Sequence, residues 1–78
     1  MKNDDKILIG SNIKRVRTKN KMKTSDLVRE VNLKGVSMNI FTLSKIEANT
    51  QHIKASQLWA IKEILQCPYE ELIKWEDA

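Results

Sequence analysis

The sequence predicts an all-α fold, a compact bundle of about five short helices, from three observations. Apolar residues recur at spacings of three and four in several segments, which is the period of an amphipathic helix. No segment shows the strict alternation of apolar and polar residues that marks a half-buried strand. The length of 78 residues suffices for one modest hydrophobic core. We therefore expect a single domain, residues 7–78, after a flexible N-terminal arm, residues 1–6.

The first predicted helix spans residues 7–20, where Ile9, Ile13 and Val16 repeat at the spacing of one helical face. Its outer face is basic. The segment KRVRTKNKMK, residues 14–23, contains six cations and no acid.

A second, short helix begins at Thr24 or the residue before it, and its apolar side carries Leu27, Val28 and Val31. The segment NLKGVSM ends this helix, because Gly35 is free to adopt a positive φ.

The segment NIFTLSKIEANT predicts a third helix with an unusual outer face. Asn39 is a good N-cap, and Asn49 can end the helix in the left-handed conformation. At about 100° per residue, the members of each face can be assigned. The inner face carries Leu43, Ile46 and Glu47, whereas the outer face carries Phe41, Ser44 and Lys45, with Ile40 at the boundary.

Two further helices follow the polar connector NTQHIK. The fourth spans residues 55–66, and its apolar stripe consists of Leu58, Ile61 and Leu65. Pro68 suits the first turn of the last helix, which holds Leu72 and Ile73.

The net charge of +4 is unevenly distributed along the chain. Residues 1–34 carry ten Lys and Arg against four Asp and Glu, a balance of +6, whereas residues 35–78 carry four against six, a balance of −2. Such a polarised basic surface is typical of proteins that bind a polyanion. A solvated helix face followed by a solvated turn gives the same pattern, so charge alone leaves both interpretations open.

Several functional classes lack their usual residues. The single cysteine, Cys67, cannot form an internal disulfide, and the single histidine, His52, has no partners for a metal site. There is no glycine-rich phosphate loop and no nucleophile beside a histidine, so we expect no enzyme activity, no cofactor, no metal and no small-molecule ligand. No apolar run approaches the roughly 20 residues that span a bilayer, and no apolar leader opens the chain. We expect a cytoplasmic protein with no membrane partner.

Five segments, in the order IGSNIKRVRTKNKM, TSDLVREV, TLSKIEANT, LWAIKEIL and CPYEELI, resemble the phage-repressor and Cro-like (XRE-type) helix-turn-helix domain. The resemblance covers residues 9–73, and LSKIE followed by a short polar loop is its most specific part. Each motif is weak alone, but their shared order and spacing argue against chance agreement. The resemblance implies a lambda-repressor-like fold that binds double-stranded DNA, with helix two as the positioning helix and helix three in the major groove.

The resemblance also implies roles for individual residues. Arg17 matches an arginine of helix one that pairs, in the family, with the glutamate matched here by Glu47, so we expect a structural ion pair. Cys67 matches an apolar position and is expected to be buried. The expected DNA contacts come from the start of helix two, from helix three and from the loop after it. They are Lys23, Thr24, Asn39, Ile40, Phe41, Thr42, Ser44, Lys45, Asn49, Thr50 and Gln51.

Two features depart from the family pattern. Thr24 stands where many members have glutamine, and it can donate only one hydroxyl hydrogen bond, which weakens the expected phosphate contact. The segment NLKGVSM is longer than the usual turn and resembles the extended-loop members. The tilt of helix three in the groove is therefore left open.

Ile40 and Phe41 allow several interpretations, because direct readout of bases usually rests on Arg, Lys, Asn or Gln. The two side chains either contact thymine methyl groups or fold back over the edge of the core, the second being favoured for Ile40. An exposed Phe41 could instead anchor a partner protein. Lys45 either reaches guanine or phosphate or is merely solvated, and residues 49–51 either contact phosphate or only cap and turn.

The predicted function is that of a sequence-specific DNA-binding transcriptional regulator, most simply a repressor that occupies its operator. The alternative is a protein-interaction module of the same fold, an adaptor or antirepressor, that uses helix three to bind a partner protein.

Trp59 and Trp75 predict a homodimer. Trp59 lies beside the apolar stripe of helix four and Trp75 lies in the tail, so both remain exposed in a monomer unless they cover each other. Helix-turn-helix regulators commonly bind two half-sites as symmetric dimers. We expect a C2 dimer through the last two helices with these indoles at or beside its interface. The alternative, in which Trp75 shields Trp59 within one chain, stays open.

Overall fold

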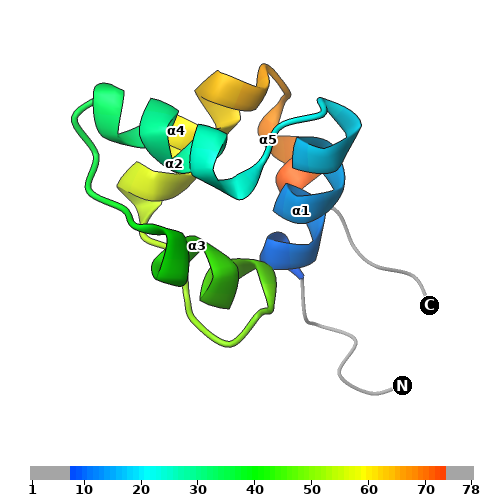
Figure 1. Cartoon of the computed structure of the whole chain (residues 1–78). Helices are drawn as coiled ribbons and strands as arrows, with labels where there is room; N and C mark the ends of the chain where they lie inside the picture. Colours follow the sequence, from blue (N-terminus) through cyan, green and yellow to red (C-terminus); the bar gives the residue numbers. More distant parts are fainter. Residues whose placement is uncertain (1–7, 74–78) are drawn as a thin grey trace, which may run out of the picture.

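Five helices make up the part of the chain that the structure, a computed structural model, describes, residues 8–73 (Figure 1). They are α1 (Ile9–Lys19), α2 (Thr24–Leu33), α3 (Ile40–Glu47), α4 (Ala55–Leu65) and α5 (Tyr69–Leu72). Residues 8–73 contain no strand, so the all-α prediction is confirmed. None of these helices has the length and apolar character needed to cross a membrane. The predicted arm, residues 1–6, as well as Ile7 and Trp75, lies outside the described residues.

The core receives side chains from all five helices. α1 packs against α3, α4 and α5, and α2 packs against α3 and α4. Each buried aliphatic side chain stabilises the fold by about 1.5–3 kcal/mol relative to an exposed one. The fully buried aliphatic residues with the largest side chains are Ile13, Leu27, Val31, Leu43, Ile46, Ile61 and Leu72.

The turns follow the predicted chemistry. Asn39 caps α3, because its Oδ1 accepts the N–H of Thr42 at 2.8 Å. Gly35 and Asn49 adopt positive φ angles of 87° and 61°, as their residue types permit. Gln66 ends α4 in the same left-handed conformation, with φ 54°, although nothing in its residue type indicated this.

Gly10 marks the closest approach of α1 to α3. A β-carbon at this position would overlap the carbonyl oxygen of Ile46 and would lie 2.8 Å from Asn49 Oδ1. Real β-carbons essentially never approach a neighbouring heavy atom so closely. Only glycine therefore allows the first turn of α1 to lie against the end of α3.

The single turn of α5 is fastened to α1 by polar contacts. Asn12 is fully buried, and its Nδ2 donates to the carbonyl oxygen of Leu72 at 2.9 Å. Arg15 donates to the carbonyl oxygen of Glu71 at 3.1 Å and forms a 3.4 Å ion pair with the Glu71 carboxylate. These contacts place the end of the described chain beside α1 (Figure 1).

Two expectations about the C-terminal half need correction. Leu58 is half-buried at the edge of the core, and the fully buried position belongs to Ala60, whose small side chain carries no strong hydrophobic signal. Cys67 is half-buried rather than buried, because it follows the end of α4 instead of lying on the inner face of a helix. Burial still raises the pKa of the Cys67 thiol, and the nearby carboxylate of Glu71 raises it further, so the thiol is protonated at neutral pH.

Candidate nucleic-acid interface

α3 turns one face to the core and the opposite face to solvent, as helical spacing predicts. Its buried side chains are Leu43, Ile46 and Glu47. On the opposite face the exposed fractions of Phe41 and Ile40 are 78% and 46%. Ser44 and Lys45 are exposed as well, and Thr42 is half-buried. This helix therefore offers solvent an apolar surface with a lysine beside it.

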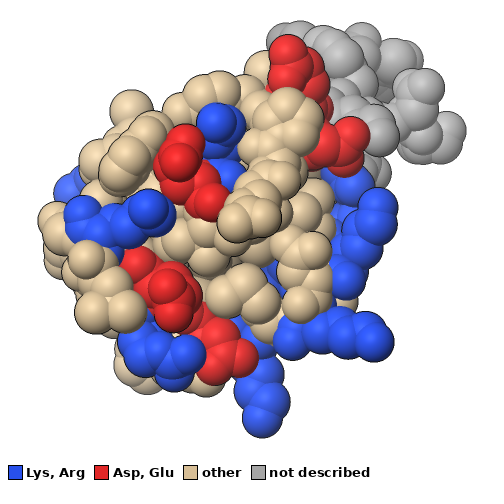
Figure 2. All heavy atoms as spheres, turned by 90° about the horizontal axis from the view of Figure 1, so that it is seen from above, with Lys and Arg blue, Asp and Glu red and all other residues tan. Residues whose placement is uncertain are grey.

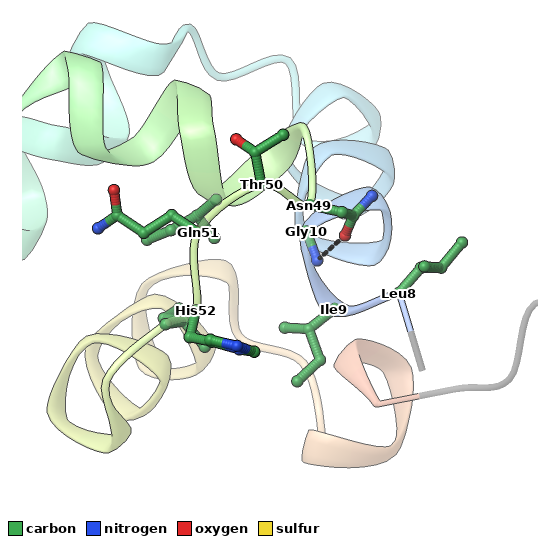
Figure 3. A pocket seen from close by; sticks show the side chains of 9 residues that line it. Leu8, Ile9, Gly10, Asn49, Thr50, Gln51 and His52 are labelled. Atoms are coloured by element: carbon green, nitrogen blue, oxygen red, sulfur yellow. Dashed lines mark hydrogen bonds between the residues drawn. The ribbon is translucent and has the colours of Figure 1, made fainter. Parts of the chain in front are cut away.

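The asparagines that flank α3 use their side chains within the protein. Asn39 provides the cap already described. Asn49 Oδ1 accepts the N–H of Gly10 at 3.1 Å (Figure 3). Asn49 Nδ2 donates to Ser11 Oγ at 2.9 Å. Asn49 ends α3 in the left-handed conformation as predicted, and its side chain in addition caps the first turn of α1 from a distant segment, which was not predicted. A phosphate contact from the same amide would compete with these bonds.

The connector after α3 forms one wall of an open pocket of about 390 Å³. Thr50 Oγ1 donates to the carbonyl oxygen of Lys45 at 3.1 Å, and the exposed side chain of Gln51 extends away from α1 (Figure 3). His52 is the only titratable side chain in the lining, and residues 8–73 contain no group of His, Cys, Asp and Glu that could hold a metal ion. The lining consists of Leu8, Ile9, Gly10, Ile46, Asn49, Thr50, Gln51, His52 and Ile53.

A buried ion pair links α1 to the end of α3. Arg17 Nε donates to Glu47 Oε2 at 2.8 Å, and Arg17 Nη2 donates to Glu47 Oε1 at 3.0 Å. The side chains are only 9% and 7% exposed, so this bidentate pair is shielded from water. The predicted Arg17–Glu47 pair is therefore present.

The same guanidinium brings the basic turn between α1 and α2 close to α3. Arg17 Nη1 donates to the carbonyl oxygen of Met22 at 2.8 Å, so Met22 and Glu47 contact one side chain. Lys21 and Lys23 flank Met22 and are exposed, and Lys21 adopts a positive φ of 59° in the turn. Two lysines consequently lie near the C-terminal end of α3.

The six cations of residues 14–23 are not equivalent. Arg15 is engaged with Glu71, and Arg17 is buried, so neither offers a free charge to a ligand. Figure 2 shows the face away from α3, where Asp and Glu form a band left of centre and a second group at the upper right, with Lys and Arg between and around them. The exposed lysines of the segment are Lys14, Lys19, Lys21 and Lys23.

The start of α2 carries an acidic cap. Asp26 Oδ2 accepts the N–H of Lys23 at 3.1 Å, and the same carboxylate lies 3.7 Å from Arg29. Thr24, the first residue of α2, is half-buried. Because the Asp26 carboxylate already occupies this helix end, the phosphate contact that the resemblance assigns to Thr24 meets a negative charge.

Trp59 is 43% exposed and lies under a lysine, since Lys34 Nζ is 5.5 Å from its ring centroid. Lys62 Nζ stands over Tyr69 in the same way, at 5.2 Å, and that ring is 41% exposed. Such cation–π contacts contribute about 0.5–1 kcal/mol at exposed sites. The helical pattern of residues 55–66 indicated that Trp59 lies beside the apolar stripe, but no pattern indicated that the ring of Tyr69 is exposed.

The sequence patterns did not indicate several of the residues that fix the geometry around α3. Gly10 and Gln57 act through contacts with distant segments. Asn32 acts through bonds to Val28 and Met38 on either side of it in the chain. Single small or polar residues of this kind carry no periodic signal. Comparisons with protein-family profiles, curated proteins and solved structures found no match. The functional assignment consequently depends on the residues of the interface.

Proposed function

We propose that the protein is a sequence-specific DNA-binding transcriptional regulator of the cytoplasm, most simply a repressor that occupies its operator with α3 in the major groove. The observation that carries the proposal is that the segment containing α3, residues 35–54, exposes no acidic side chain. Glu47 is the one acidic residue within residues 35–54, and it is buried against Arg17. Lys45 on α3, together with Lys21 and Lys23 near its end, adds positive charge. A phosphate backbone attracts such a surface.

On DNA, the exposed side chains of α3 would divide between bases and backbone. Phe41 and Ile40 can contact thymine methyl groups, which apolar side chains recognise in the major groove. Ser44 and Lys45 carry donors for base edges or phosphate oxygens. The exposed lysines outside α3 would contact phosphates, which fix orientation without reading sequence. Nothing in this proposal requires a cofactor or a catalytic step.

The alternative is a protein-interaction module that uses α3 to bind a partner protein. It is favoured by the 78% exposure of Phe41, because large aromatic side chains are typical anchors of protein interfaces. Burying this ring in the groove of a partner would depend only weakly on salt. The two functions can therefore be separated by the effect of ionic strength.

Affinity for duplex DNA is expected to fall steeply as salt is added, because each neutralised phosphate releases a counterion. Lys21→Ala or Lys23→Ala should weaken binding to all sequences about equally and should reduce the log–log salt slope by about one. Lys14→Ala and Lys19→Ala are expected to act in the same direction. Fluorescence anisotropy titrations of a labelled duplex at several salt concentrations measure both quantities.

Lys62→Ala is the matched control for these lysine variants. Lys62 has the same charge but lies over Tyr69 and pairs with Glu63, so its removal should leave the salt slope unchanged. An affinity that does not depend on salt would contradict the proposed phosphate contacts and would favour the protein-interaction module.

We further propose a C2 homodimer through α4 and α5, with Trp59 and Trp75 at or beside its interface. The exposed rings of Trp59 and Tyr69 support it, because a second copy could cover both. Sedimentation at micromolar concentration is expected to show a dimer, alone or on a palindromic duplex, and Trp59→Ala should weaken it. Phe41→Ala, which removes an exposed ring from α3, should not. A strictly monomeric protein in both conditions would eliminate the dimer and would favour shielding of Trp59 within one chain.

A further inference from the structure

The turn between α2 and α3 is held by the side chain of Asn32, which hydrogen-bonds to both the N–H and the carbonyl group of one turn residue. Asn32 Oδ1 accepts the N–H of Met38 at 3.2 Å, and Asn32 Nδ2 donates to the carbonyl oxygen of Met38 at 3.0 Å. Asn32 Nδ2 also donates to the carbonyl oxygen of Val28 at 3.0 Å. One carboxamide thus satisfies both backbone polar groups of Met38 and ties that residue to the last turns of α2.

Gln57 holds the same turn from α4. Its Nε2 donates to the carbonyl oxygen of Ser37 at 3.3 Å, while its Oε1 accepts the N–H of Lys54 at 3.0 Å. The Gln57 residue is only 5% exposed, and Met38, which follows Ser37, is 7% exposed in the core. Two consecutive residues of the turn are therefore fixed to two different helices.

These bonds act directly before α3. Met38 precedes Asn39, the residue whose side chain caps the first turn of α3. The six residues that connect α2 to α3 include exposed Gly35, where an added β-carbon would meet no other atom within 4 Å. Val36 and Met38 pack against the core, and the bonds to Met38 and Ser37 add a directional constraint at the point where α3 begins.

We infer that Asn32 is a positioning residue, which sets the direction of α3 and thereby the placement of Phe41 and Ile40 against DNA. The inference rests on the proposed function where it concerns base readout. Groups that read a ligand must be held within about 0.5 Å of their productive positions. Asn32 fixes the start of α3, while Arg17 fixes its end through Glu47. Leu43 and Ile46 keep α3 on the core when the Asn32 bonds are lost, so the expected change is a small shift of its first turn.

The first test compares Asn32→Ala with the wild-type protein on two duplexes, one selected by the wild type from a randomised pool and one scrambled. The ratio of affinities for the selected and scrambled duplexes should be about tenfold smaller in the variant than in the wild type, which is the effect of one lost base contact. Affinity for the scrambled duplex should not change, because the exposed lysines are untouched. Leu33→Ala is the matched control, since Leu33 adjoins Asn32 and is 73% exposed. A full preference in Asn32→Ala would overturn the inference, as would an equal loss on both duplexes in a folded variant.

A second readout needs no DNA. Hydrogen exchange of the Thr42 and Leu43 amides should become roughly tenfold faster in Asn32→Ala, as expected when about one net hydrogen bond is lost, while exchange at Val16 stays the same. Unchanged exchange would refute positioning by Asn32. If Asn32→Ala does not fold, Asn32→Asp replaces it in the exchange test with the same expected effect, because it keeps the acceptor for Met38 N–H and lacks the donor. It is not used on DNA, since its added negative charge would weaken binding to both duplexes. Failure of the wild type to select any sequence would refute the proposed function, and the exchange result would still decide the positioning role.

Discussion

Glu47→Ala is expected to lower the free energy of unfolding by about 3–5 kcal/mol, because it leaves the Arg17 guanidinium buried without its carboxylate. The pair is bidentate and nearly excluded from water, which is the situation in which loss of one partner costs most. Each kcal/mol lowers the Tm of a domain this size by about 4–8 °C. Thermal unfolding followed by circular dichroism should therefore show a fall of more than about 12 °C.

Glu71→Ala is the control for that measurement, because it removes the carboxylate of an ion pair whose two side chains are 40% exposed. Exposed pairs contribute less than about 1 kcal/mol, so its Tm should change by only a few degrees. Glu47→Gln, which keeps one acceptor for Arg17, should fall between wild type and Glu47→Ala. An unchanged Tm in Glu47→Ala would mean that the pair does not hold α1 to α3.

Gly10→Ala is the second substitution with a large expected effect. Whether it raises or lowers the stability of the protein shows how closely α1 and α3 must pack. In an open helix position, alanine is more favourable than glycine by about 1 kcal/mol. Here the added methyl group would overlap the carbonyl oxygen of Ile46, and overpacking of this kind typically costs about 1–3 kcal/mol or more. We expect a net loss of stability, measured by urea unfolding at constant temperature.

Ser11→Ala provides the matched control in the same turn of α1. It removes the hydroxyl that accepts a bond from Asn49 but adds no atom to the contact with α3, so its effect should be small. A Gly10→Ala protein as stable as the wild type, or more stable, would show that α1 and α3 need not approach so closely.

Helical periodicity predicted the elements and the inner faces because burial follows the spacing of large apolar residues. Ile13, Leu43 and Ile61 are fully buried as expected, and Asn39 caps α3 through a bond within its own first turn. Such local features can be recognised in a sequence because the atoms involved are only a few residues apart.

The contacts between helices could not be predicted in this way. A periodic pattern indicates which face of a helix is apolar, but it does not indicate which helix lies against that face. Gly10 must be glycine because Ile46 of α3 lies against it, and Gln57 is fixed by its bond to Ser37. Neither contact can be recognised from the spacing of residues in the sequence. The Arg17–Glu47 pair is the exception, and it was inferred from the family resemblance rather than from the pattern.

The exposed residues of α3 are different from the residues that hold the helix in place. Phe41 and Lys45 are exposed, whereas α3 is anchored through other atoms, namely those of Met38 before it and Glu47 at its end. Exposed substitutions outside such anchors usually change stability by less than about 0.5 kcal/mol. Recognition and folding can therefore vary independently, and new binding preferences could arise by exchange of outward residues on an unchanged scaffold.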